Sequence, residues 1–185
     1  MRILLKLALD IDAEAAWRAL HSPAALAELY GPLLNVEPMA GGGMPTRWTD
    51  GADAPVRYSS FGMGLGAHLI AVHDRRTTDG HGEVRILRDT GIPLTGPLAT
   101  LDVWDHQMAV APLPGDPART LWRERLVIGG RAAPALWAPL WAAWQWRGAR
   151  LKRLAPTWAF DPPPAEPDAV GPAEPEDAEA GAADE

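Results

Sequence analysis

A long apolar stripe near the end of the chain constrains the fold more than any other feature of the sequence. Within residues 131–155, apolar residues recur at steps of three and four, the spacing of one face of a helix. They are Ala133, Leu136, Trp137, Leu140, Trp141, Trp144, Gly148, Leu151 and Ala155. Trp146, Arg150 and Arg153 fall on the opposite face, where the Arg150 guanidinium can lie over the Trp146 ring. One helix with so wide an apolar face needs a broad cover, and a sheet is the broad surface that this chain can build.

The chain before this helix consists of short segments. Residues 2–10 alternate as a strand does, Asp12 can cap a short helix, and Ser22-Pro23 opens a second one that Gly31-Pro32 ends. Glycine and proline turns separate the remaining apolar runs, which favours an antiparallel meander. Strands are expected at 34–39, 46–49, 55–61, 67–77, 83–89, 99–112 and 119–128. The sequence therefore predicts an α+β fold that ends in a long helix.

A change in composition divides the chain into a domain at 1–160 and a tail at 161–185. The tail holds nine acidic residues, no basic ones and several prolines, so we expect it to be disordered. Without it, 15 acidic residues stand against 17 basic ones, whereas the whole chain has a net charge of −7. The domain itself is thus nearly neutral, which does not favour a nucleic-acid partner.

Several other function classes find little support. The chain has no cysteine, and its five histidines lack the close spacing of a metal site, so we expect neither a metal nor another cofactor. The Gly62-x-Gly64-x-x-Ala67 run matches a dinucleotide fingerprint but leads into strand-like alternation, which indicates a hairpin or bulge. No apolar run reaches 18 residues and no secretory signal is found, so we expect a cytoplasmic protein without stable membrane insertion. The oligomeric state stays open.

Candidate chemistry gathers on the last two predicted strands. Period-two alternation places Trp104, His106 and Met108 on one face, and Trp122 and Glu124 on the face that we expect to be interior. A buried carboxylate at Glu124 requires a partner. It could pair with Arg57, Arg85 or Arg88 across the sheet, which is the simpler interpretation. Alternatively, it could act with His106, and with His68 and Tyr58 nearby, in proton transfer.

The chain also resembles the START-like superfamily, also called the SRPBCC or polyketide cyclase-like proteins, over residues 1 to about 158. The resemblance rests on the order of the elements, on the segment from Asp12 to Pro23, and on Gly96-Pro97, Trp104-Asp-His106 and the Arg119–Leu126 segment. It implies a helix-grip fold, in which six to seven antiparallel strands curve around the C-terminal helix. It also implies an elongated cavity between sheet and helix for an apolar or amphipathic small molecule.

We therefore expect the protein to bind a small hydrophobic ligand. The predicted ligand-binding residues are Tyr58, His68, Trp104, His106, Met108, Trp122, Glu124, Trp137, Trp141 and Trp144. The three helix tryptophans could line the cavity or fill it. One alternative is a polyketide cyclase or dehydratase that uses His106 and Glu124 as acid and base. Another is a regulatory or chaperone-type interaction module.

Overall fold

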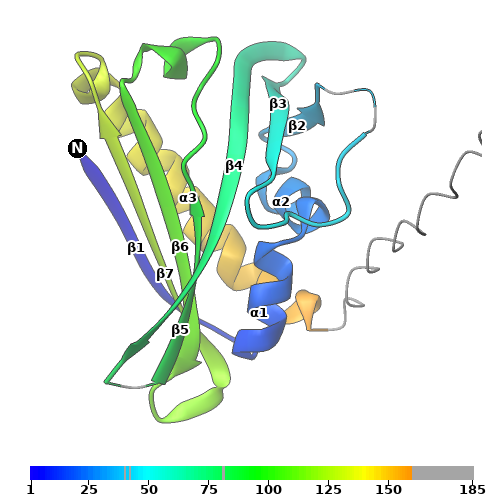
Figure 1. The fold of residues 1–185 in the computed structure, drawn as a ribbon, viewed down its shortest axis with the longest axis vertical. Coiled ribbons are helices and arrows are strands. Elements are labelled where there is room, and N and C mark those ends of the chain that lie inside the picture. Colours follow the sequence, from blue (N-terminus) through cyan, green and yellow to red (C-terminus); the bar gives the residue numbers. More distant parts are fainter. Residues whose placement is uncertain (40, 42, 81, 160–185) are drawn as a thin grey trace, which may run out of the picture.

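The computed structural model describes residues 1–39, 41, 43–80 and 82–159, and the predicted tail lies outside these ranges. The elements run β1 (Arg2–Leu9), α1 (Ala13–Leu20), α2 (Pro23–Tyr30), β2 (Asn35–Pro38), β3 (Asp53–Ser60), β4 (Met63–Asp79), β5 (Gly82–Asp89), the short 3₁₀ helix η1 (Pro97–Thr100), β6 (Val103–Leu113), β7 (Asp116–Gly129) and α3 (Ala133–Trp158). Figure 1 shows α3 running behind the sheet, beside β1, β6 and β7.

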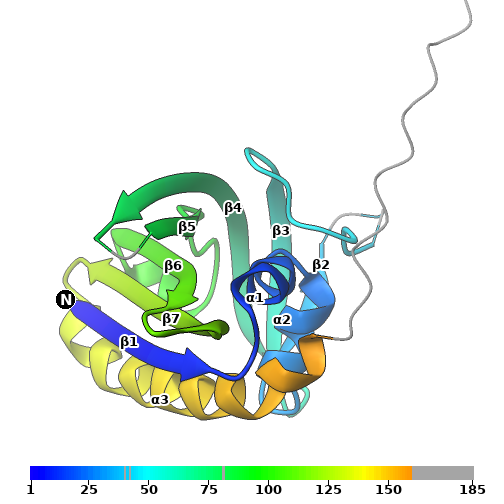
Figure 2. The same ribbon diagram turned by 90° about the horizontal axis from the view of Figure 1, so that it is seen from below.

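The strands of the described residues form a seven-stranded sheet in the order β1-β7-β6-β5-β4-β3-β2, with antiparallel neighbours throughout. Seen from below, the sheet curves strongly, with α3 along one side of the concave face and α1 and α2 closing another (Figure 2). The predicted α+β helix-grip fold, with two short helices after the first strand, is confirmed.

The two short helices begin where their capping residues predict. The Asp12 carboxylate accepts a hydrogen bond from the Ala15 amide at 2.8 Å, and the Ser22 hydroxyl accepts one from the Ala25 amide at 3.2 Å. Arg150 of α3 donates through Nε to the Leu29 carbonyl at 3.3 Å, near the end of α2. Its guanidinium also lies 5.7 Å from the centre of the Trp146 ring, as the spacing predicts.

The inner face of α3 follows only part of the predicted stripe. Trp144, Gly148, Leu151 and Ala155 are buried, and a Cβ at Gly148 would lie 2.9 Å from Leu5 Cδ1, so glycine allows the helix to approach β1 closely. The prediction is wrong for Trp141, whose side chain is 45% exposed.

Two predicted strands change where tertiary contacts override local pattern. Residues 46–49 form no strand, although Trp48 is buried and its amide donates to the His21 carbonyl. β6 begins at Val103, because η1 occupies part of the predicted 99–112 segment. β3 and β4 pair as an antiparallel hairpin that turns between Ser60 and Met63, and the register shifts where Gly64 and Gly66 face β3. This confirms the prediction of a hairpin or bulge at the glycine-rich run. Gly66 has φ +126°, and a Cβ there would meet the Thr95 carbonyl oxygen at 2.2 Å. Glycine at this position therefore lets the loop between β5 and η1 pack against the start of β4.

Within the described ranges, no helix is long and apolar enough to cross a membrane.

Candidate functional site

A cavity of about 370 Å³ lies between the concave face of the sheet and the helices. Every layer of the fold contributes to its wall. Apolar side chains from α1 and α2, from β4 to β7, from η1 and from α3 dominate the wall. They include Leu20, Leu26, Leu29, Ile70, Val72, Leu87, Leu98, Met108, Leu140 and Leu151. The polar side chains of the wall are few: Tyr30, Tyr58, Asp89, His106 and Arg147, together with five tryptophans. An apolar chamber with a few polar groups is the usual form of a small-molecule site.

A buried ion pair joins the sheet to α3 beside this cavity. Arg147 Nε lies 3.0 Å from Glu124 Oε1 and 3.1 Å from Oε2, and the two side chains are 2% and 0% exposed. Burial by itself raises the pKa of Glu124, but the Arg147 charge and hydrogen bonds from His106 and Trp122 outweigh it and lower the pKa to about 2. Glu124 is therefore an ionised carboxylate whose partners hold it in place.

His106 is positioned by the same carboxylate. Its Nε2 lies 3.2 Å from Glu124 Oε2, while the Trp122 indole donates to Oε1 at 2.8 Å. Because the carboxylate is ionised, Nε2 carries the proton of this hydrogen bond. Among the described residues, Nδ1 of His106 makes no hydrogen bond, and His106 lies in the cavity wall. The ring therefore has one nitrogen fixed and one available to a ligand.

A second pair of buried polar residues, His68 and Asp89, lies on the strands next to the His106–Glu124 pair. Asp89 of β5 is directly opposite His106 of β6. Its carboxylate accepts hydrogen bonds from the Ala71 and Gly91 amides at 3.0 Å each, and His68 Nε2 lies 3.6 Å from its other oxygen. Burial alone raises the pKa of Asp89, but the nearby His68 and the hydrogen bonds from these amides outweigh burial and lower it.

The His68–Asp89 pair and the His106–Glu124 pair together form one row of polar residues across four neighbouring strands. His68 of β4, Asp89 of β5, His106 of β6 and Glu124 of β7 are all buried. The register explains the row: Met108 is opposite Glu124, so His106 and Glu124 are diagonal neighbours. No group of three or more histidine, cysteine or carboxylate side chains suited to a metal ion is found in the described part of the chain.

Two tyrosines complete the polar part of the wall. The Tyr30 ring at the end of α2 lies against Arg147, whose guanidinium carbon is 5.1 Å from the ring centre. Tyr58 of β3 lies beside His68, with ring centres 5.9 Å apart. Burial raises the pKa of both hydroxyls, so both are neutral at pH 7.

The structure brings most of the predicted site residues together. The cavity wall contains Tyr58, Trp104, His106, Met108, Trp122 and Trp144. His68 and Glu124 are not wall residues but make direct contact with them, His68 with Trp104 and Tyr58, and Glu124 with His106 and Trp122. Trp137 and Trp141 stack on each other away from the cavity wall, and the Trp137 indole donates to the Arg2 carbonyl. Of the three helix tryptophans, Trp144 lines the cavity, while Trp137 and Trp141 lie outside it, so the three do not fill it.

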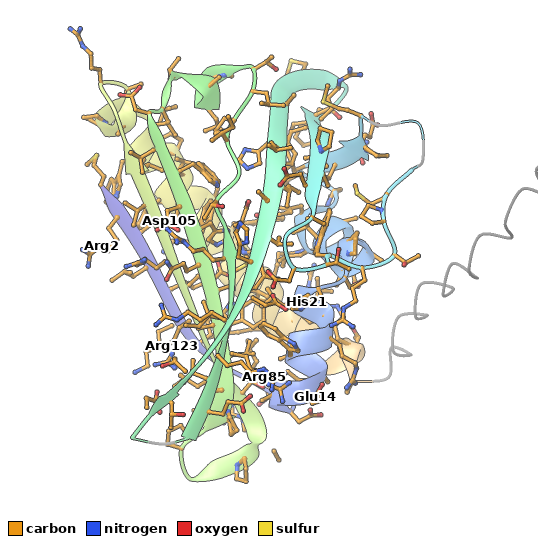
Figure 3. All side chains as sticks on the ribbon, in the orientation of Figure 1. Arg2, Glu14, His21, Arg85, Asp105 and Arg123 are labelled. Atoms are coloured by element: carbon orange, nitrogen blue, oxygen red, sulfur yellow. The ribbon has the colours of Figure 1, made fainter. Side chains whose placement is uncertain are left out.

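The predicted partners of Glu124 need correction. A partner arginine is present, but it is Arg147 of the helix rather than Arg57, Arg85 or Arg88 of the sheet. Arg88 pairs with Asp105 at 2.7 Å. Arg85 of β5 pairs with Glu14 of α1 at 2.6 Å, and Figure 3 shows these two side by side at the lower end of the sheet. Arg57 and Arg88 alternate along their strands with the inward-facing Tyr58 and Asp89, so their side chains point to the outer face of the sheet. Arg85 shares the face of Leu87 but lies farther along β5, opposite Val110, and its partner there is Glu14.

Sequence reasoning missed Arg147 and Asp89 as wall residues. Arg147 is three residues after Trp144 and four before Leu151, so helical spacing alone places it on the inner face. Asp89 is two residues after the buried Leu87, which is the strand equivalent of the same signal. Trp48 and Trp158 also belong to the wall, but Trp48 lies in a loop and carries no periodic signal.

A curved antiparallel sheet, a long helix packed against its concave face and a cavity between them define a helix-grip fold. Comparison with solved structures agrees. A structural-genomics protein from Chromobacterium violaceum is similar with a TM-score of 0.55 and 18% identity, over 83% of this chain and 96% of that one. A hypothetical protein from Helicobacter pylori gives a TM-score of 0.57 and 14% identity, over 84% and 88% of the two chains.

Norcoclaurine synthase from Thalictrum flavum, solved in complex with dopamine and hydroxybenzaldehyde, is also similar. Its TM-score is 0.53 at 12% identity, over 85% of this chain and 87% of that one. Identities this low show the shared fold alone. No family model matches the sequence, and no curated protein matches it.

Proposed function

We propose that this protein binds a small apolar or amphipathic molecule in the cavity between the sheet and α3. The observation that carries the proposal is the chamber of about 370 Å³, with its apolar wall and its few polar groups. The structure of norcoclaurine synthase with small aromatic molecules supports it, since that protein has the same fold.

A fluorescent probe tests this proposal with two matched variants. N-phenyl-1-naphthylamine, which brightens in apolar surroundings, should saturate the wild-type protein with one site. Ala25 is buried in the cavity wall, so Ala25→Phe should occupy part of the chamber and weaken probe binding about tenfold or more. Ala149 is exposed on α3, so Ala149→Phe should bind as the wild type does. Equal binding by both variants would contradict a site in this cavity.

Proton-transfer catalysis in the same cavity is the second candidate. The observation that favours it is the His106–Glu124 contact, in which the fixed Nε2 leaves Nδ1 of His106 as a base beside the chamber. Glu124, with its pKa of about 2 and every oxygen engaged, is suited to orient His106 rather than to exchange protons itself. This revises the acid and base pair expected from the sequence, because the acid–base step falls to His106.

Hydrogen–deuterium exchange tests the enzyme candidate without knowledge of the substrate. 2-Acetonaphthone has protons on the carbon beside its carbonyl, which a base can remove to leave an enolate that regains a deuteron from D₂O. Wild-type protein should accelerate this exchange, measured by proton NMR, and His106→Gln should abolish the acceleration while still binding N-phenyl-1-naphthylamine. Binding without accelerated exchange in the wild type would leave the protein a binder and reject catalysis of this kind.

A further inference from the structure

Only some polar atoms of the cavity wall can be reached by a ligand. Unpaired nitrogens such as Nε1 of Trp144 and Nη1 of Arg147 are completely enclosed by protein, so a molecule in the cavity cannot touch them. Within the described residues, no atom of Asp89, His106 or Tyr58 is unpaired and enclosed in this way. All three side chains line the cavity, and those of Asp89 and His106 are 13% and 8% exposed. Their free atoms are therefore the polar contacts open to a ligand.

Two of these free atoms are hydrogen-bond acceptors. One carboxylate oxygen of Asp89 accepts both backbone amides, whereas the other lies 3.6 Å from His68 Nε2, beyond hydrogen-bond distance. On His106, Nε2 donates to Glu124, which leaves the lone pair of Nδ1 as an acceptor. Asp89 and His106 are directly opposite each other on β5 and β6, so their Cβ atoms are about 5 Å apart on the same face of the sheet. The two acceptors therefore belong to neighbouring side chains.

A tyrosine hydroxyl near these acceptors supplies a donor. The Tyr58 ring lies beside His68, which in turn faces Asp89, and the Tyr58 hydroxyl makes no hydrogen bond within the described part of the chain. Burial raises the pKa of Tyr58 most, and the negative charge of Asp89 raises it further, so the hydroxyl lies within range of this carboxylate and keeps its proton at pH 7. The wall thus offers two acceptors and one hydroxyl donor.

We infer that the ligand carries a hydroxyl group, as an alcohol or a phenol, which donates to Asp89 or His106 and accepts from Tyr58. A hydroxyl can do both, because one oxygen holds a proton and two lone pairs. An ether oxygen cannot donate, an ammonium group cannot accept, and a carboxylate would be repelled by the ionised Asp89. This inference rests on the proposed binding function and adds the chemical class of the ligand.

Four naphthalene compounds that differ in their polar group test this inference by calorimetry at pH 7: naphthalene, 2-naphthol, 2-methoxynaphthalene and 2-(aminomethyl)naphthalene. 2-Naphthol should bind at least about fivefold more tightly than naphthalene and than the ether, which keeps the oxygen but lacks its proton. The amine should bind more weakly than 2-naphthol, because its charged nitrogen has no lone pair for the Tyr58 hydroxyl. Equal binding of 2-naphthol and the ether, or tighter binding of the amine, would overturn the inference.

Two variants then identify the acceptor. Asp89→Asn keeps a carbonyl oxygen for the backbone amides and replaces the free oxygen with an NH₂ donor. His106→Phe keeps an aromatic ring against Trp144 and removes Nδ1. At least one of the two should reduce the preference for 2-naphthol over the ether by about fivefold or more. A loss in one variant alone assigns the hydroxyl proton of the ligand to that residue.

Asp105→Asn is the matched control on β6. Asp105 precedes His106, but its carboxylate pairs with Arg88 and Arg125 and is not part of the cavity wall, so this variant should keep the full preference. Circular dichroism confirms that each variant is folded. An unchanged preference in both Asp89→Asn and His106→Phe would overturn the inference and leave the binding function standing. Failure of every compound, naphthalene included, to bind the wild type would overturn both.

Discussion

Replacing Arg147 with leucine removes the cation of the buried ion pair and leaves Glu124 ionised in the core. Both side chains are almost completely buried, and Arg147 Nε contacts both carboxylate oxygens at 3.0 and 3.1 Å. Breaking such a pair from one side costs about 3–5 kcal/mol, because the remaining charge is buried without a counter-ion. We expect Arg147→Leu to lower the free energy of unfolding by an amount in this range.

The lowered pKa of Glu124 expresses the same interaction as a free energy. A tenfold change in proton affinity corresponds to about 1.4 kcal/mol, so a pKa lowered from 4.5 to about 2 reflects roughly 3 kcal/mol of net stabilisation of the carboxylate. Arg147 is the largest favourable cause, and His106 and Trp122 supply the rest. The lower end of the range is therefore the better estimate for the loss on removing Arg147.

Urea unfolding at pH 7, followed by circular dichroism, measures this effect. Arg153→Leu is the matched control, because Arg153 is exposed on the same helix and its loss should change stability by less than about 0.5 kcal/mol. The double variant Arg147→Leu/Glu124→Gln should be more stable than Arg147→Leu alone, since the neutral amide needs no cation. Equal loss in Arg147→Leu and Arg153→Leu, or a further loss in the double variant, would refute the reasoning.

Three further predictions concern stability. The carboxylates of Glu124 and Asp89 have lowered pKa values, so the stability they contribute is complete above about pH 4.5 and is lost as the pH falls toward 2. The urea midpoint, measured between pH 7 and 2, should fall in this window, and it should fall less steeply in Glu124→Gln. A midpoint that does not change with pH would contradict this prediction. Asp12→Ala removes the cap of α1 and should cost about 1 kcal/mol in the same assay, whereas no change would show that the cap is not needed. Leu151→Ala, at a fully buried site, should cost about 2–5 kcal/mol, and Leu4→Ala, at a site 61% exposed, should cost far less.

Local patterns predicted most elements of this fold. The caps at Asp12 and Ser22 start helices in the structure, and the alternation of Trp122, Glu124, Leu126 and Ile128 marks the buried face of β7. Capping and alternation depend on residues close in sequence, so they can be recognised without knowledge of the rest of the chain. The segment at 46–49 shows the limit, because Trp48 is buried by contacts with distant elements while its backbone forms no strand.

The sequence predicted that the buried Glu124 has a charged partner, but not which residue that partner is. A carboxylate on the apolar face of β7 had to have a partner, because burial of an unpaired charge is too costly. The partner is Arg147, which helical spacing also places on the inner face of α3. Choosing between Arg147 and the arginines of the sheet requires the position of α3 over β7, and that position results from contacts between residues far apart in sequence.

The sequence by itself determined the order of the elements, the need to cover the apolar face of the C-terminal helix, and the presence of polar groups on the concave face. Only the tertiary structure decided that Trp144 lies in the cavity wall while Trp141 is exposed, and that a chamber of about 370 Å³ remains. The physical reason is that periodicity defines a face within a few residues. The space between two faces depends on the curvature of the whole sheet, on the approach of α3 that Gly148 permits, and on the volumes of all the side chains between them.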